Sequence, residues 1–264
     1  MFFKINRRAT FYIYLSALIM MICFLVIDLV TSIYFPSNIT ISLGYGERVS
    51  HYYAFFTTQS NYLVVLYFVY YLYTLYFNKT RPSFAIRLAV TVYISITMLV
   101  FWGGIFTQTQ ELIHYSIYTW INTTTLHLIM PIIMITSFVL TSGREQIAIK
   151  KWHHNHLWLI ALYPVIYSVV ILIRGYLKSL DNITPPNTWY PYYFFNFYQP
   201  YGWLIASAAV IVIFGLVFGL QYFYMWINNL MFKRSQNEKQ QLELYYQKTL
   251  IKVNRQIKKS KYKP

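Results

Sequence analysis

"TFYIYLSALIMMICFLVIDLVTSIY" occupies positions 10–34 and carries a single charged residue, Asp28. About 20 predominantly apolar residues in a helix are enough to cross the hydrocarbon core of a bilayer. The stretch is too long for the apolar core of a signal peptide, and no small-residue cleavage site follows it. We therefore expect a retained membrane-spanning helix.

The composition extends this expectation to the whole chain. Apolar residues make up 57% of the 264 residues and charged residues only 11%, whereas soluble domains carry about 25% charged residues. An all-α, polytopic membrane protein is therefore predicted, with a six-helix transmembrane domain over 1–228 and a basic cytoplasmic tail over 229–264. The six expected spans are 10–34, 52–77, 85–106, 118–141, 157–179 and 200–228.

The basic residues predict the orientation of these spans. Of the 22 Lys and Arg residues, 19 lie before the first span, around the second and fourth connections, or in the tail. The other three are Arg48, Arg174 and Lys178. The positive-inside rule then places both termini in the cytoplasm, as an even number of spans also requires. The richness in Ile, Asn, Lys and Tyr suggests an AT-rich bacterial genome, so we expect a multi-pass protein of the bacterial cytoplasmic membrane.

The basic tail has two interpretations that the sequence leaves open. Segment 233–263 mixes apolar residues with lysines, as an amphipathic helix on anionic lipid headgroups would. A solvated tail that only maintains the topology is the alternative. Since the basic residues gather on one side of the expected membrane, we expect lipid partners and no nucleic acid.

The sequence contains little that would bind a metal ion or a cofactor. The single cysteine, Cys23, lies inside the first span, which rules out an intrachain disulfide and argues against a thiolate metal site. The histidines of "WHHNH" at 152–156 have no acidic or thiol partner nearby. No metal and no cofactor are expected.

Strongly polar residues fall at a common depth in the expected spans. Thr57 to Asn61 begin the second span, Asn122 to His127 begin the fourth, and Asp28 and Arg174 precede the outer ends of the first and fifth. Ionisable groups inside membranes usually face the bundle interior and mark functional sites. The coincidence predicts an outward-facing polar pocket within the membrane.

Helical spacing sharpens this prediction on the second span. Thr57, Ser60 and Asn61 are related by three and four residues, so they share one stripe, whereas Thr58 and Gln59 turn away from it. The shared stripe is expected to face the bundle. Threonines in membrane helices also commonly bond back to a preceding carbonyl, which is the structural alternative for Thr57.

Two further features involve the other spans. Pro131 lies four residues after His127 and cannot donate to its carbonyl, so a break in the helix is expected beside the histidine. A structural hydrogen bond is the simpler role for His127. Asp28 and Arg174 could form an ion pair that acts as a clamp or gate, or Arg174 could extend to the interface.

Four blocks then suggest a relationship: "FFTTQSNYLVV" (55–65), "LHLIMPIIM" (126–134), "YPVIYSVVILIRG" (163–175) and "WYPYYFFN" (189–196). These blocks occur in the order seen in the bacterial Pr-six-Pr family of membrane proteins. The chain resembles that family over about 10–228, without the tail. That family is similar to the androgen-induced-gene group of six-span proteins. These are hydrolases of fatty acid esters of hydroxy fatty acids, with an intramembrane threonine nucleophile and a histidine partner.

The resemblance implies Thr57 as the nucleophile, with Thr58 as a register alternative, and His127 as its partner. A threonine hydroxyl needs a positioned base, and a neutral imidazole can serve near physiological pH. The other polar groups of the pocket are expected to contact substrate, by stabilising an oxyanion or by holding a polar end. These are Ser60, Asn61, Asn122, Asp28 and Arg174.

Three functions remain open on the sequence. The leading hypothesis is a hydrolase of lipid or fatty acyl esters that uses Thr57 and His127. The alternative is a non-catalytic transporter or lipid-binding protein, in which the same pocket holds a ligand and Asp28 with Arg174 forms a gate. In the third, the polar groups only hold the helices together.

Overall fold

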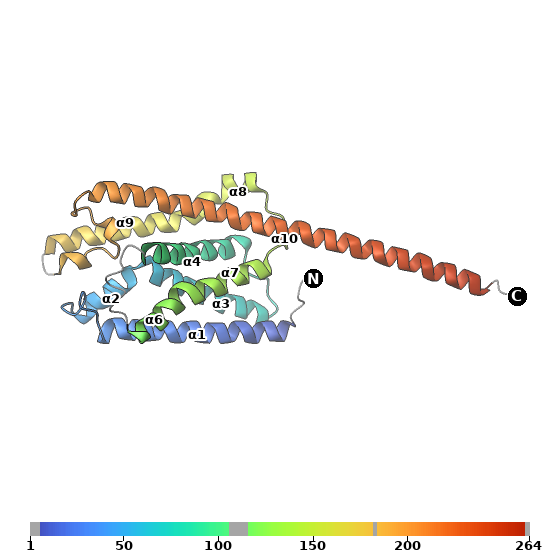
Figure 1. The fold of residues 1–264 in the computed structure, drawn as a ribbon, viewed down its shortest axis with the longest axis horizontal. Coiled ribbons are helices and arrows are strands. Elements are labelled where there is room, and N and C mark those ends of the chain that lie inside the picture. The colour runs from blue at the N-terminus through green and yellow to red at the C-terminus, as the bar shows by residue number, and fades with distance from the viewer. Residues whose placement is uncertain (1–5, 106–115, 182–183, 262–264) are drawn as a thin grey trace.

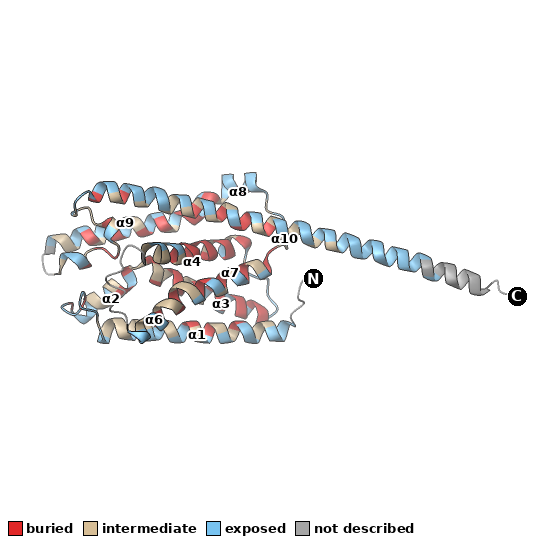
Figure 2. Ribbon diagram, viewed as in Figure 1, coloured by how far each residue is buried: buried red, intermediate tan, exposed pale blue. Residues whose placement is uncertain are grey.

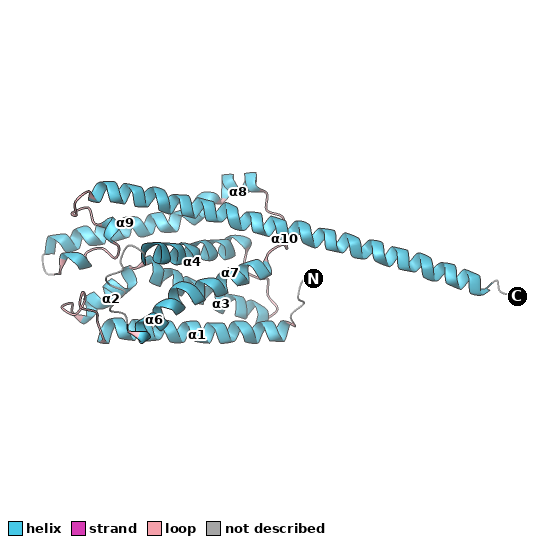
Figure 3. Cartoon of the chain, viewed as in Figure 1, coloured by secondary structure: helices cyan, strands magenta, loops and turns pink. Residues whose placement is uncertain are grey.

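The computed structural model of the protein describes residues 6–105, 116–181 and 184–261, and this part of the chain has helices and no strand (Figure 3). This confirms the all-α prediction for the described residues. The elements are α1 (Arg7–Tyr34), α2 (Tyr45–Ala54), α3 (Phe56–Tyr76), α4 (Phe84–Ile105), α6 (Ile117–Thr124), the π-helical η1 (Thr125–Ile129), α7 (Met130–Thr141), α8 (Ile149–Asn155), α9 (Leu157–Asp181), the short 3₁₀ turns η2 (Pro186–Thr188) and η3 (Tyr193–Phe195), and α10 (Gly202–Lys261).

Within the described ranges, five helices are long and apolar enough to cross a membrane. They are Arg7–Tyr34, Phe84–Gly104, Ile117–Thr141, Leu157–Leu180 and Gly202–Ile251. The sequence predicted a sixth span over 52–77, but α3 is not in this set. Its first turns hold five consecutive polar residues and its remainder is rich in tyrosine, which lowers its mean hydropathy.

The packing explains how α3 accommodates its polarity. The helix lies between α1 and α4 and contacts both, and Val64, Phe68 and Leu72 are buried along it (Figure 2). Neighbouring helices therefore cover much of its surface and supply partners for its polar groups. Inside a bundle, such groups avoid the cost of contact with hydrocarbon.

The predicted span 52–77 is wrong in its first turn, because the chain breaks at Phe55. This residue has extended backbone angles, φ −78° and ψ 130°, and it separates α2 from α3. Helix α2 lies before the break and carries Glu47, Arg48 and His51. The polar run at 57–61 thus begins a helix instead of lying within one.

The two ends of the bundle differ. The start of α1 and the point where α10 leaves the bundle lie at one end (Figure 1). Helix α2 and the segment between α9 and α10 lie at the other end (Figure 1). Two hydrophobic clusters hold the bundle together. One joins α4, α7, α9 and α10, and the other joins α1, α3, α4 and α7.

Helix α10 is a single helix of 60 residues, Gly202–Lys261. The boundary expected between span and tail at 228/229 is therefore not a break in the helix. Beyond the bundle α10 projects as a straight rod with exposed side chains (Figure 2). At about 1.5 Å per residue, the helix is much longer than the about 20 residues that cross a bilayer.

Candidate functional site

A cavity of about 1240 Å³ opens among α1, α2, α3, α4, α6, η1, α10 and the segment around Tyr192. Its lining is divided by chemistry. Polar side chains come mainly from α1, α2, α3 and α6, among them Asp28, Thr58 and Asn122. Apolar side chains come mainly from α4 and α10, among them Leu99 and Val212. One end of the cavity therefore suits a polar group and the other an apolar chain.

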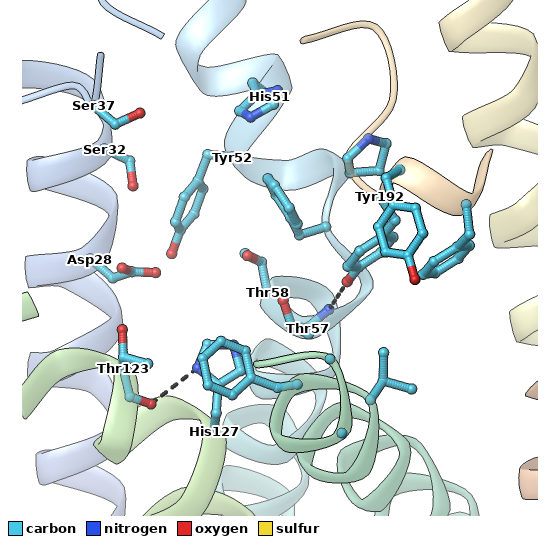
Figure 4. A pocket seen from close by; sticks show the side chains of 18 of the residues that line it. Asp28, Ser32, Ser37, His51, Tyr52, Thr57, Thr58, Thr123, His127 and Tyr192 are labelled. Carbon is cyan, nitrogen blue, oxygen red and sulfur yellow. Dashed lines mark hydrogen bonds between the residues drawn. The ribbon is translucent and has the colours of Figure 1, made fainter. Parts of the chain in front are cut away.

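Thr57 lines this cavity from the first turn of α3. The first amides of a helix have no partner within it, and two tyrosine hydroxyls accept here. The Phe56 amide donates to Tyr167 Oη at 3.1 Å, and the Thr57 amide to Tyr192 Oη at 3.2 Å (Figure 4). The Tyr167 hydroxyl donates in turn to the Ala54 carbonyl at 2.8 Å. The tyrosines thus stabilise the break that exposes Thr57.

The amide of Thr58 differs from its neighbours. The Gln59 amide donates to the Phe55 carbonyl at 3.2 Å, but no hydrogen bond among the described residues uses the Thr58 amide. Both Thr57 and Thr58 line the cavity. The Thr58 amide therefore has no acceptor among the described residues, although Thr58 itself lines the cavity.

His127 lines the same cavity from η1, the π-helical turn just before Pro131. Because Pro131 has no N–H, it cannot donate a hydrogen bond to the His127 carbonyl. The indole of Trp102 donates to that carbonyl instead, at 3.0 Å. The helix thus departs from α geometry where the sequence predicted a break. Such single π-turns are frequent at functional sites.

The His127 ring is held on two sides. Its Nδ1 lies 3.0 Å from the Thr123 carbonyl (Figure 4), and Phe101 stacks on it with ring centroids 3.8 Å apart. A carbonyl can only accept, so Nδ1 must carry the proton of the neutral ring. Nε2 is then unprotonated and able to take a proton, as a general base requires.

Asp28 and Asn122 meet at the polar end of the cavity. The Asn122 amide group donates to Asp28 Oδ1 at 2.7 Å, and Asn122 is only 8% exposed. The Tyr52 hydroxyl points toward the Asp28 carboxylate (Figure 4). Asp28, Asn122, Thr57 and His127, four of the predicted site residues, therefore line one cavity.

Ser60 and Asn61 do not line the cavity. The Ser60 hydroxyl contacts Thr97 Oγ1 at 2.6 Å and the Thr57 carbonyl at 3.0 Å, and the Asn61 amide donates to the same carbonyl at 2.8 Å. Conversely Thr58, expected to turn away, does line it. Ser60 and Asn61 are buried, so this part of the stripe does face the bundle as predicted, but it lies outside the cavity. Because α3 starts at Phe56, the cavity lies at the helix N-terminus and not along one face.

The expected ion pair of Asp28 and Arg174 is wrong. Arg174 donates to the Ser50 hydroxyl at 3.3 Å and to the Trp189 carbonyl at 2.9 Å, and it does not line the cavity. It ties α9 to α2 and to the segment that follows α9. The sequence predicted similar depths for the two residues, but their side chains contact different helices.

Three aromatic residues of the site, Tyr52, Trp102 and Tyr192, were not predicted from the sequence. Each looked like one of many aromatic residues near the ends of spans, and no spacing distinguished it. Burial raises the pKa of Tyr192, so its hydroxyl stays protonated beside Thr57. Burial and the positive charges of Arg174 and Lys178 lower the pKa of His51, which lines the cavity, to about 4.

No family model, curated protein or solved structure matches this chain. The resemblances carried by the four sequence blocks therefore stay predictions. The function has to be argued from the geometry of the cavity.

Proposed function

We propose that the protein is a six-span protein of the cell membrane, bacterial by its composition, with both termini in the cytoplasm and the cavity open to the outside. Five apolar helices support membrane insertion, and α3 would be the sixth span, shielded by α1 and α4. The start of α1 and the exit of α10 share one end of the bundle (Figure 1). The charge distribution supports a cytoplasmic position for that end.

We further propose that the protein hydrolyses lipid or fatty acyl esters. The observation that carries this proposal is that Thr57 shares the cavity with a histidine whose tautomer is set by the Thr123 carbonyl. A hydroxyl nucleophile needs such a base. The apolar wall formed by α4 and α10 suits an acyl chain.

The proposed reaction has two steps. The Thr57 hydroxyl oxygen attacks the ester carbonyl carbon while His127 Nε2 takes its proton, and the resulting oxyanion accepts from the Thr58 amide. The bond to the alcohol then breaks, and His127 returns the proton to the leaving alkoxide. Water attacks the acyl-threonine with His127 again as base, which releases the acid and restores Thr57.

The test is ester turnover by the purified protein. Thr57→Ala and His127→Ala should each reduce kcat/KM by about 100- to 10,000-fold, which is the usual rate contribution of a nucleophile or general base. Matched controls are Thr249→Ala in the tail and His154→Ala at the cytoplasmic end, both of which are exposed and should keep full activity. Thr58→Ala should retain more activity than Thr57→Ala, because its backbone amide remains.

A wild type without turnover, or Thr57 and His127 variants as active as the controls, would contradict the hydrolase. The first outcome would favour the alternative, a transporter or lipid-binding protein. The ion-pair gate expected for a transporter has lost its support, since Arg174 bonds to Ser50 and Trp189. We therefore rank the hydrolase first.

For the tail we propose contact with anionic headgroups. Beyond the bundle α10 exposes Leu242, Tyr246 and Leu250 among its lysines, and each basic residue near an anionic surface adds about 1 kcal/mol of attraction. A polarity-sensitive dye on Tyr246→Cys, with Cys23→Ala to avoid labelling the native thiol, should shift to the blue in anionic nanodiscs and not in neutral ones. Equal spectra would favour the solvated tail.

A further inference from the structure

The polar end of the cavity presents oxygen atoms and one carboxylate without a cationic partner. Asp28 accepts from Asn122, and no ion pair among the described residues includes it. Thr31, Ser32 and Thr58 line the cavity around it. A carboxylate within an apolar bundle is costly unless a positive or donating group approaches it.

Asn122 adds an acceptor whose direction is set by its partner. Because the carboxylate of Asp28 can only accept when ionised, the amide NH₂ of Asn122 must face it. The amide oxygen, Oδ1, then points elsewhere, and it is buried without a hydrogen-bond partner. Asn122 is 92% buried, since its exposed fraction is 8%. A buried acceptor of this kind is rarely left unpaired in a folded protein.

The basic side chains of the cavity wall do not neutralise the charge of Asp28. All three guanidinium nitrogens of Arg48 donate to backbone carbonyls, those of Ile33, Thr40 and Ile41. His51, with its pKa lowered to about 4, is neutral near pH 7. Asn122 and the Tyr52 hydroxyl offer Asp28 neutral donors only (Figure 4). The ligand must therefore bring the positive charge itself.

We propose that this end of the cavity binds an ammonium group, with Asp28 as its counter-ion and Asn122 Oδ1 as a further acceptor. An ammonium group supplies three donors and a positive charge, which match a carboxylate, an amide oxygen and a neighbouring hydroxyl such as Thr58. A carboxylate end group would face the charge of Asp28 and another unpaired acceptor, and it is excluded by repulsion.

The assignment also implies a class of substrate, and that implication rests on the proposed hydrolase function. With the ammonium group at Asp28 and the apolar chain along α10, the ester lies near Thr57. The small side chains of Ala208 and Ala209 and the side chain of Val212 border the cavity on α10 and leave room for an acyl chain. The substrate is then an acyl ester of an amino alcohol, and not an ester that carries a free carboxylate.

The experiment compares three soluble six-carbon probes, hexylammonium, hexanol and hexanoate, by calorimetric titration of the purified protein in a neutral detergent. Hexylammonium should bind at least about tenfold more tightly than hexanoate, as expected for a charge-assisted hydrogen bond. The isosteric Asp28→Asn change should weaken the binding of hexylammonium by about tenfold and leave the affinity for hexanol unchanged. The matched control Glu145→Gln removes an exposed carboxylate at the other end of the bundle and should change nothing.

Equal affinities, a preference for hexanoate, or a hexylammonium affinity that survives Asp28→Asn would overturn the proposal. Binding of sodium alone, with the same dependence on Asp28, would assign the site to a metal ion and also overturn it. If Asp28→Asn does not fold, Asn122→Ala provides a second test. This change should weaken the binding of hexylammonium relative to that of hexanol. An Asn122→Ala protein that binds like the wild type would count against the proposal.

Failure of this proposal is distinguishable from failure of the hydrolase. Thr57→Ala should lose turnover and keep the preference for hexylammonium, because Thr57 takes no part in holding the ammonium group. Ammonium preference without ester turnover would refute only the hydrolase. Turnover without ammonium preference would refute only the assignment of this end of the cavity.

Discussion

At the scale of single residues, the contact between Trp102 and His127 is open to a direct test. Trp102→Phe keeps an aromatic ring but removes the donor that serves the His127 carbonyl beside Pro131. We expect unfolding stability to fall by about 1–2 kcal/mol, the cost of one lost hydrogen bond with a poorly solvated acceptor. Trp158→Phe, at a side chain that is 65% exposed, is the control, and thermal unfolding in detergent is the measurement. Equal midpoints for the two variants would contradict the prediction.

His51 predicts a pH dependence of stability. Burial and the charges of Arg174 and Lys178 lower its pKa to about 4, although a backbone hydrogen bond at Thr188 and the charge of Glu47 act in the opposite direction. The unfolded chain, with a histidine pKa of about 6.5, binds the proton more readily than the folded protein. The contribution of His51 is therefore complete above about pH 6.5 and declines as the pH falls toward about 4, by at most about 1.4 kcal/mol per pH unit.

The measurement is the unfolding midpoint at several pH values between 7.5 and 4.5. His51→Gln, which cannot be protonated, should show a smaller decrease over this interval than the wild type. His154→Gln, at an exposed site, should follow the wild type. A His51→Gln protein with an unchanged pH profile would rule out this histidine as the cause.

At the scale of elements, Gly175 determines how α9 packs against the segment that carries Tyr192. A Cβ at Gly175 would lie 2.1 Å from Tyr190 Cε1, and Tyr190 is buried. Gly175→Ala must therefore displace an aromatic ring from a filled space, at a cost of about 1–3 kcal/mol. Because Tyr192 accepts from Thr57, the change should also lower any ester turnover.

Gly215 offers the matched control, since it lies within helix α10 and a Cβ there meets no atom within 4 Å. Gly215→Ala should be neutral or should stabilise the helix by about 0.5–1 kcal/mol. Both variants are compared by thermal unfolding. If Gly175→Ala is as stable as Gly215→Ala, the close packing of Tyr190 on α9 does not constrain the site.

The helices also show where sequence patterns were sufficient. The start of the helix expected at 118–141 agrees within one residue with α6, and the end with α7, because long apolar runs bounded by polar loops determine such spans. The break at Phe55 had no comparable signal. It depends on Tyr167 and Tyr192, which lie more than 100 positions away and satisfy the first amides of α3.

At the scale of the whole molecule, the proposed orientation can be tested by labelling. In a Cys23→Ala background, Tyr45→Cys should react with an impermeant thiol reagent added outside intact cells. Gln240→Cys should react only after permeabilisation, because the proposed orientation has the tail inside the cell. Both positions are at least partly solvent-facing in the fold. The opposite pattern would reverse the orientation, and outside labelling at both positions would contradict an even number of spans.

The sequence by itself determined an all-α protein with long apolar helices, and it marked Thr57, His127, Asp28 and Asn122 as unusual, because polar groups in apolar segments stand out locally. Only the tertiary structure decided which of them share a cavity. It separated Arg174 from Asp28, turned Ser60 and Asn61 onto the Thr57 carbonyl, and brought Thr58 to the cavity wall. These outcomes depend on contacts between distant helices and on where one helix begins, and neither is encoded in the spacing of residues along a single span.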